Sequence, residues 1–262
     1  MAMARPPNHD ILPASGEPWW RQFFDSPDCL RLGRFPDAKT SQQEAEQVAR
    51  LLGLRPGTVI ADVPCGPGRH MPVWIRHGCT AVGLDASPRM LRLAVEKSAR
   101  AGARPMLVAG LMQKLPFADN VFDAFVCLFN SFGYLDDDEE NGQVIAEASR
   151  CLRPGGALLL DTRNPPIEIL TAPYREPDTL ADGRVVCCSS RYDSATRRLN
   201  TIWSLAATGQ TVYIASIRLY GPGELKNMFE AAGLSVEGLY GDFAGTPFRG
   251  DHGQLVILGR KR

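Results

Sequence analysis

The fold of this chain is decided by the stretch Thr58-Val-Ile-Ala-Asp-Val-Pro-Cys-Gly-Pro-Gly-Arg-His70. Residues 58–63 are apolar and rich in β-branched side chains, which predicts a buried strand. A turn with two glycines then leads into a helix expected over residues 69–76. Gly66 and Gly68 allow the backbone to approach a ligand that a side chain would exclude. A helix N-terminus presents free N–H groups, so this turn suits a phosphate or the carboxylate of an amino-acid-like ligand.

A second strand, expected over residues 80–84, ends at Asp85. An acid at the tip of this strand can accept hydrogen bonds from two ribose hydroxyls. The glycine turn and Asp85 both follow the carboxyl ends of strands, which is where open α/β sheets bind their ligands. The two features therefore predict one ligand site.

Strands and helices alternate on both sides of this segment. Ser41-Gln-Gln-Glu44 is a capping box that predicts the start of a helix, and Ser87 followed by Pro88 predicts another start. Further strands are expected over residues 105–109, 122–129 and 157–161, and helices over 41–52, 87–100 and 136–152. Such alternation predicts an α/β fold with a doubly wound, mainly parallel sheet.

The pattern changes after the fifth strand. Residues 184–192, 197–206 and 210–220 alternate apolar and polar side chains, which predicts three antiparallel strands. A helix over residues 223–232 and strands near 235–240 and 254–259 follow. We therefore divide the chain into an N-terminal tail and helical segment (1–40), a ligand-binding core (41–170), an antiparallel insertion (171–220) and a C-terminal part of the core sheet (221–262).

The N-terminal segment carries Trp19, Trp20, Phe23 and Phe24 at roughly helical spacing. These residues form either a short helix packed on the body of the protein or a cover over the ligand. The sequence leaves both alternatives open.

Composition excludes several functions. Lys+Arg and Asp+Glu number 29 each among 262 residues, so the basic surplus typical of nucleic-acid binders is missing. The seven cysteines are scattered without a CxxC pair, which predicts a reduced cytoplasmic protein without a metal site. No apolar stretch approaches 18 residues, and residues 1–15 lack an apolar signal-peptide region, so neither a membrane span nor secretion is expected.

Two classes of nucleotide cofactor fit a glycine turn and a ribose-binding acid. The dinucleotide fingerprint G-x-G-x-x-G needs a third glycine, but Met71 stands at that position. The acid on the strand before the turn, Asp62, suits an amino-acid cofactor better than a pyrophosphate.

The motifs resemble those of the class I S-adenosylmethionine-dependent methyltransferases. Asp62-x-Pro64-x-Gly66-x-Gly68 is similar to the family's acidic, glycine-rich first motif, and Asp85 to its ribose-binding acid. Leu115-Pro-Phe117-x-x-x-x-Phe122-Asp123 and Leu152-Arg-Pro-Gly-Gly156 are similar to the segments before its fourth and fifth strands. The resemblance covers about residues 50–165. It implies a seven-stranded Rossmann-like sheet with an antiparallel seventh strand, and a core that binds S-adenosylmethionine and releases S-adenosylhomocysteine.

The resemblance also implies a set of cofactor-binding residues. These are Asp62, Pro64, Cys65, Gly66, Gly68, His70, Asp85, Ala86, Met90, Leu111, Met112 and Leu128. His70 could equally be a helix-packing residue. Two positions depart from the family pattern: Pro64 replaces the first glycine of the motif, and Leu111 stands where similar enzymes often carry an acid that accepts from the adenine amino group.

The methyl acceptor is expected over the ends of the fourth and fifth strands. Pocket candidates for it are Tyr134, Arg163, Asn164, Arg218, Tyr220 and Asp242. None of the four histidines lies at the end of the fourth strand, where small-molecule O-methyltransferases often carry one. No metal-ligand cluster of the catechol type is visible, so neither a catalytic base nor a metal is assigned.

The acceptor is predicted to be a small molecule that takes the methyl group on an oxygen, nitrogen or carbon atom, with no nucleic acid and no membrane as partner. The insertion resembles the lid of small-molecule methyltransferases, although it could instead form a homodimer interface. Two further hypotheses keep the fold: a non-methylating enzyme such as a cyclase, and a non-catalytic binding module for the cofactor.

Overall fold

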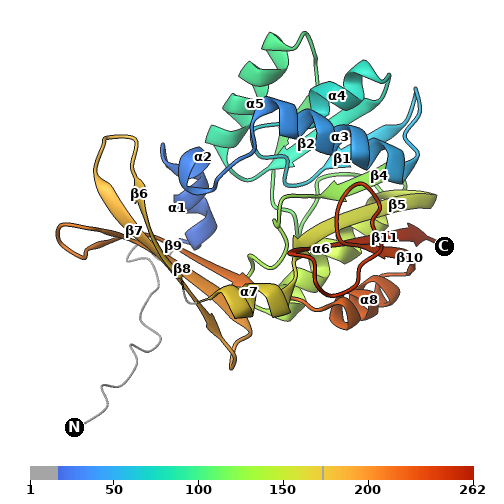
Figure 1. Ribbon diagram of the computed structural model, residues 1–262. Helices are drawn as coiled ribbons and strands as arrows, with labels where there is room; N and C mark the ends of the chain where they lie inside the picture. The colour runs from blue at the N-terminus through green and yellow to red at the C-terminus, as the bar shows by residue number, and fades with distance from the viewer. Residues whose placement is uncertain (1–16, 173) are drawn as a thin grey trace.

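A computed structural model describes residues 17–172 and 174–262, whose strands form two sheets (Figure 1). The larger sheet has seven strands in the order β10-β11-β5-β4-β1-β2-β3. The strands are β1 (Val59–Asp62), β2 (Thr80–Asp85), β3 (Met106–Ala109), β4 (Phe122–Cys127), β5 (Leu152–Arg163), β10 (Leu234–Tyr240) and β11 (Gln254–Lys261). β1 to β5 pair in parallel, and β11 runs antiparallel to both β5 and β10. The predicted doubly wound, mainly parallel α/β fold is confirmed.

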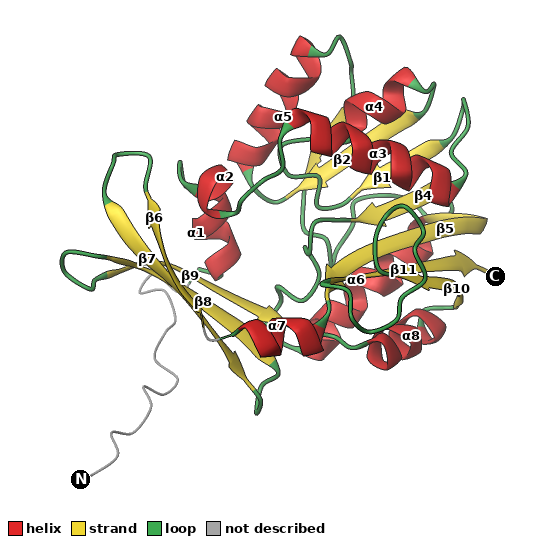
Figure 2. Ribbon diagram, in the orientation of Figure 1, coloured by secondary structure: helices red, strands yellow, loops and turns green. Residues whose placement is uncertain are grey.

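Helices cover both faces of this sheet (Figure 2). One face carries α3 (Ala38–Leu52), α4 (Met71–Arg76) and α5 (Pro88–Arg100), and the other carries α6 (Asp138–Cys151) and α8 (Pro222–Ala231). Each face has its own hydrophobic core, and successive residues of β1 point into opposite cores. Ile60 packs in the core beneath α3, α4 and α5, and Ala61 packs in the core beneath α6 and α8. This is why the central strands are apolar at nearly every position.

The start of α3 differs from the prediction. Asp37 is its N-cap, since its carboxylate accepts from the backbone N–H of Thr40 at 2.7 Å. Ser41 therefore lies inside the first turn, where its side chain is buried. The predicted cap at Ser87 is confirmed, because its hydroxyl accepts from the N–H of Met90 at 3.1 Å.

The insertion forms a separate sheet of four antiparallel strands, which we call the lid sheet. It consists of β6 (Tyr174–Thr179), β7 (Val185–Asp193), β8 (Arg198–Leu205) and β9 (Thr211–Arg218), paired in that order. The sequence predicted only three strands and missed both β6 and the preceding helix α7 (Pro165–Thr171). β6 is an edge strand that contains Pro177, a residue that sheets tolerate only at edges and bulges and that obscures the strand pattern.

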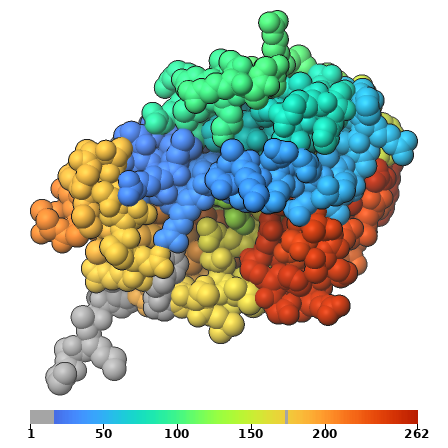
Figure 3. Space-filling view, turned by 45° about the horizontal axis from the view of Figure 1, so that its top comes forward, coloured from blue at the N-terminus to red at the C-terminus, as the bar shows by residue number. Residues whose placement is uncertain are grey.

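The N-terminal segment forms two short helices, α1 (Trp19–Asp25) and α2 (Cys29–Leu32), which lie between the lid sheet and the main sheet (Figure 1). Phe23 of α1 stacks on Trp203 of β8 with ring centroids 5.1 Å apart. Figure 3 shows the blue N-terminal helices lying against the yellow and orange lid strands. The aromatic residues of this segment thus form a third core between the two sheets.

Candidate active site

A cavity of about 340 Å³ lies between the carboxyl ends of the parallel strands and the lid sheet. Its sheet half is lined by residues that follow β1, β2 and β3. Its lid half is lined by α1, by the loop after β4 and by β7 to β9. Eleven of the twelve predicted cofactor-binding residues line the sheet half, namely Asp62, Pro64, Cys65, Gly66, His70, Asp85, Ala86, Met90, Leu111, Met112 and Leu128.

Asp85 is fixed at the tip of β2 by two backbone groups. Its carboxylate accepts from the N–H of Gly66 and from the N–H of Ser87, both at 2.8 Å. The side chain is buried, and burial raises the pKa of Asp85 to about 6, although both hydrogen bonds favour the ionised form. The glycine turn and the acid are therefore one preorganised unit in the wall of the cavity.

Asp62 ends β1 beside the same turn. Only 3% of its surface is exposed, and its Oδ2 atom has no hydrogen-bond partner among the described residues. Burial raises the pKa of Asp62 to about 7, with the nearby Arg69 guanidinium acting in the opposite direction. A buried carboxylate oxygen without a partner can accept from a cationic or hydrogen-bond-donating ligand group.

The two glycines of the turn have different roles. Both have left-handed φ angles, +53° at Gly66 and +65° at Gly68. Gly66 lines the cavity, and a Cβ there would meet only the Phe35 ring at 3.8 Å. A Cβ at Gly68 would come within 2.9 Å of the Ala94 Cβ and 3.0 Å of the Met71 Cε. Gly68 therefore lets the turn approach α5 closely, and it is not among the lining residues of the cavity. Its predicted role in making room for the ligand stays a prediction.

Arg69 is a functional candidate that the sequence analysis missed. Its guanidinium pairs with Glu44 of α3 and lies over the Phe129 ring at 4.8 Å, while its Nη2 atom is buried without a partner among the described residues. The signal was its place directly after Gly68. A buried guanidinium that lines the cavity beside a helix N-terminus can bind a carboxylate.

His70 combines both of the roles considered for it. It lines the cavity, and its ring also stacks on Trp74 at 5.6 Å while its Nε2 atom lies 3.2 Å from a Glu44 carboxylate oxygen. Burial lowers the pKa of His70 to about 4, despite the opposing hydrogen bond to Glu44. The imidazole is therefore neutral at physiological pH.

The loop after β4 joins the two halves of the cavity. Phe129 and Asn130 both have left-handed φ angles, +64° and +57°, and their N–H groups donate to Asp161 at 2.6 and 3.4 Å. Such a conformation costs a residue with a side chain about 1–2 kcal/mol. The buried Asp161 carboxylate thus holds a strained backbone that brings Phe129 to the sheet half and Tyr134 to the lid half.

Two of the six predicted acceptor-pocket residues line the cavity. Tyr134 packs edge-on against Trp19 at 5.0 Å and stacks on Phe24 at 5.8 Å, and burial raises the pKa of its hydroxyl well above the ordinary value. Arg163, at the end of β5, pairs with Glu168 of α7 at 3.0 Å.

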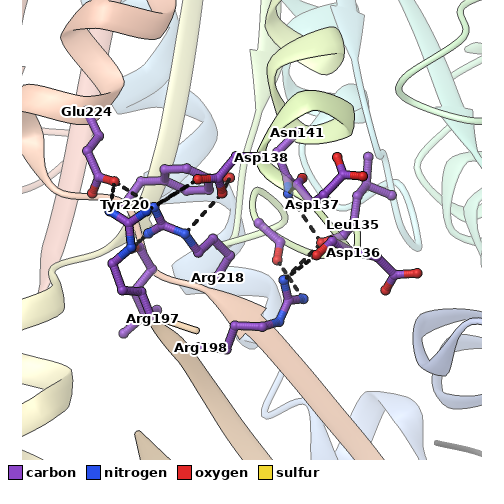
Figure 4. Close-up of polar contacts among 12 residues, drawn as sticks. Leu135, Asp136, Asp137, Asp138, Asn141, Arg197, Arg198, Arg218, Tyr220 and Glu224 are labelled. Atoms are coloured by element: carbon purple, nitrogen blue, oxygen red, sulfur yellow. Dashed lines mark hydrogen bonds and ion pairs between the residues drawn. The ribbon is translucent and has the colours of Figure 1, made fainter. Parts of the chain in front are cut away.

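Arg218 and Tyr220, which were predicted for the acceptor pocket, lie outside the cavity lining. Figure 4 shows the polar contacts of both side chains. The Arg218 guanidinium binds Asp138 of α6 at 3.0 Å and Glu224 of α8 at 2.6 Å, and the Tyr220 hydroxyl donates to Asp138 at 2.6 Å. These side chains fasten the last lid strand to the helices beneath the main sheet. They are therefore structural.

Asn164 and Asp242 are also outside the lining. The Asn164 amide donates to the backbone oxygens of Gly250 and His252 at 2.9 and 2.8 Å, and Asp242 accepts from the N–H of Thr246 at 3.0 Å. Both side chains hold the loop between β10 and β11.

Within residues 17–172 and 174–262, no group of three or more His, Cys, Asp or Glu side chains is arranged to hold a metal ion. None of the described helices is long and apolar enough to cross a membrane.

Comparison with known proteins points to one activity. The family model described as a methyltransferase domain matches residues 60–156. The dTDP-3-amino-3,4,6-trideoxy-alpha-D-glucopyranose N,N-dimethyltransferase of Streptomyces venezuelae is 30% identical over 237 residues, which is 83% of this chain and 92% of that protein.

Two solved structures share the fold. The CcbJ methyltransferase of Streptomyces caelestis has a TM-score of 0.74 at 23% identity, covering 92% of this chain and 98% of that one. The amino pentose methyltransferase CalS10 of Micromonospora echinaspora, solved with S-adenosylmethionine bound, has a TM-score of 0.64 at 23% identity, covering 90% and 96%.

Proposed function

Since the chain belongs to the class I S-adenosylmethionine-dependent methyltransferases, we propose that it transfers a methyl group to an amine nitrogen of a small-molecule acceptor. The observation that carries this proposal is the pair of buried carboxylates, Asp62 and Asp85, at the ends of neighbouring strands in one cavity. The family assignment and the relative's activity on an amino sugar support the reaction class.

The sheet half of the cavity fits S-adenosylmethionine group by group. Asp85 is positioned to accept hydrogen bonds from the ribose hydroxyls. The unpartnered oxygen of Asp62 suits the α-amino group, and the unpartnered Nη2 of Arg69 suits the carboxylate. Leu111 and Met112 provide an apolar site for the adenine ring, with no carboxylate at either position to accept from its amino group.

When bound, S-adenosylmethionine supplies an activated methyl group on a sulfonium, which a nucleophile takes by in-line displacement. The protein contributes by placing the acceptor and by excluding water. Trp19, Phe24 and Tyr134 close the lid half with packed aromatic rings. The strained loop at Phe129 holds Tyr134 at the junction of the two halves, where the acceptor and the methyl group must meet.

The titratable side chains of the cavity favour a nitrogen acceptor over a hydroxyl. A hydroxyl needs a base to remove its proton, whereas a neutral amine already carries a free electron pair. Among the described lining residues of the lid half, Asp178 is the one carboxylate, and it lies 3.5 Å from Arg31. Tyr134 holds its proton because its pKa is raised, and His70 is a weak base because its pKa is lowered.

Two measurements test the proposal. Calorimetry with S-adenosylmethionine should show that Asp85→Ala weakens binding about 10- to 150-fold, the loss of about 1.5–3 kcal/mol for hydrogen bonds to a charged group. Asp119→Ala, which removes an exposed carboxylate, is the control and should bind normally. Asp85→Asn replaces Asp85→Ala in this binding measurement if the alanine variant is unstable. Unchanged affinity in both Asp85 variants would exclude this residue from the cofactor site.

The reaction itself is tested with labelled S-adenosylmethionine and pairs of amines and alcohols that share a skeleton. Methyl transfer to the amines, with the alcohols inert, is the expected result. Transfer to the alcohols alone would refute the nitrogen acceptor. Cofactor binding without transfer to any amine would instead favour non-methylating chemistry or a binding module.

A further inference from the structure

Strands β7, β8 and β9 of the lid sheet present uncharged side chains to the cavity. Leu199, Thr201 and Trp203 alternate along β8 and line the cavity, as do their cross-strand partners Ile217, Ala215 and Cys188. The wall thus consists of six neighbouring side chains without a charge. Its one hydroxyl, that of Thr201, is already paired with the Ser190 hydroxyl at 2.6 Å.

The wall contributed by α1 is aromatic. Trp19, Trp20, Phe23 and Phe24 line the cavity from this helix. The indole N–H of Trp19 is buried and has no partner among the described residues, which leaves a hydrogen-bond donor available on a mostly apolar wall. Such a wall suits a ligand that is mostly apolar.

Each guanidinium that lines the cavity has a carboxylate partner, and among the described residues Arg69 and Arg163 each keep one buried nitrogen without a hydrogen bond. Arg34, Arg69 and Arg163 are the three guanidinium groups among the described lining residues, and they pair with Glu176, Glu44 and Glu168 respectively. A nucleoside diphosphate brings a concentrated negative charge that recognition sites meet with basic groups. The lid half offers it no basic side chain without a carboxylate partner.

We propose that the acceptor is an amine carried on an apolar ring system and that it is not linked to a nucleoside diphosphate. This inference rests on the proposed amine methylation and specifies its substrate class. The aromatic rings of α1 and the aliphatic side chains of β8 and β9 bind the apolar body, and the amine lies near Tyr134, where the lid half meets the sheet half.

The test compares two kinds of acceptor with S-adenosylmethionine as donor. The apolar probes are 2-phenylethylamine and tryptamine, and the charged probe is a dTDP-linked 3-amino sugar. We expect kcat/KM for the better apolar amine to exceed that for the nucleotide sugar at least tenfold. Methylation of the nucleotide sugar alone would overturn the substrate class but leave the proposed function intact. Methylation of neither kind would overturn both.

A matched pair of variants locates the binding wall. Ile217 and Ile214 both lie half-buried on β9, but Ile217 lines the cavity and Ile214 does not. Ile217→Ala should raise the KM for the apolar amine about 5- to 50-fold, the effect of removing three carbon atoms from a half-buried side chain, whereas Ile214→Ala should leave it unchanged. Ile217→Val gives a smaller rise if the alanine variant folds poorly. Equal KM values in all three variants would show that the lid sheet does not bind the acceptor.

Discussion

Replacing Arg218 with methionine tests whether this residue is structural, as its contacts indicate, or belongs to the acceptor pocket. The Arg218 side chain is 3% exposed and pairs with Asp138 at 3.0 Å and Glu224 at 2.6 Å. Its guanidinium also lies 4.2 Å from the centre of the Tyr220 ring. Methionine keeps much of the volume of the side chain and removes the charge.

The size of the effect follows from the exposure of the partners. Removing one member of a fully buried ion pair costs about 3–5 kcal/mol, because an uncompensated charge is left in the interior. Asp138 and Glu224 are 53% and 38% exposed, so water can hydrate them after the substitution. We therefore expect the free energy of unfolding to fall by about 1.5–3 kcal/mol, the range for hydrogen bonds to charged groups. For a chain of this length that lowers Tm by about 3–12 °C.

Arg197 provides the matched control. It pairs with the same two carboxylates, at 3.5 and 2.7 Å, but its side chain is 51% exposed. Arg197→Met should cost about 0–1 kcal/mol, as exposed ion pairs do. Calorimetric or denaturant unfolding of both variants gives the comparison. An equal loss in the two variants would refute the argument from burial, and a raised acceptor KM in Arg218→Met at full stability would return Arg218 to the pocket.

The difference in unfolding free energy between wild type and Arg218→Met should depend on pH through Asp138. Burial opposes ionisation of Asp138, but the Tyr220 hydroxyl and the Arg218 guanidinium together hold the pKa of Asp138 below its usual value. A carboxylate with a lowered pKa stabilises the folded state above its unfolded pKa of about 4 and loses that contribution as the pH falls through the lowered value. The stability gap between wild type and Arg218→Met should therefore be constant near neutral pH and narrow below about pH 4.

Two further predictions concern the cofactor site. Gly68→Ala should lower Tm, because the new Cβ would approach Ala94 and Met71. Gly66→Ala, at a residue that lines the cavity, should mainly weaken S-adenosylmethionine binding in calorimetry. The reverse pattern would contradict the separate roles assigned to the two glycines. Burial raises the pKa of Asp85 to about 6, and the protonated acid is a poorer acceptor for ribose hydroxyls, so cofactor affinity should fall as the pH drops through about 6. Binding that is independent of pH between 5 and 7.5 would contradict this role.

The sequence was sufficient to predict which residues line the sheet half of the cavity, because these residues stand where the parallel strands end. Asp62 and Asp85 each end a short apolar strand, and neighbouring parallel strands bring their carboxyl ends together. The close packing of Gly68 against α5 could not be predicted, because a glycine in a turn has the same sequence signal whether it makes room for a ligand or for a neighbouring helix. Only the position of α5, set by tertiary packing, separates the two.

The lid half could not be predicted in the same way. Arg163 lines the cavity while the next residue, Asn164, turns away to bind the loop between β10 and β11. Arg218 ends a lid strand, and its side chain turns away from the cavity to bind Glu224 at the start of α8 and Asp138 of α6, which is 80 positions away in the sequence. Side-chain direction at such positions depends on how the lid sheet docks, which local periodicity does not encode.

The docking of the lid sheet also explains why Tyr134 is placed so firmly. Gly133 has a φ of +94°, and a Cβ there would come within 2.2 Å of the Arg218 backbone oxygen, so only glycine permits β9 to approach this loop. The N–H of Arg218 donates to the Gly133 oxygen at 2.8 Å, and the Arg198 guanidinium donates to the Leu135 oxygen at 3.1 Å (Figure 4).

Tyr134 lies between these two anchors, while Asp161 holds the other end of the same loop at Phe129. The loop is therefore fixed by the main sheet on one side and by the lid sheet on the other. Asp62 and Asp85 end β1 and β2 and share no hydrogen bond with the lid sheet among the described residues. A substitution that weakens the contacts of Gly133 or Leu135 with the lid sheet should therefore alter acceptor placement at Tyr134 more than it alters cofactor binding.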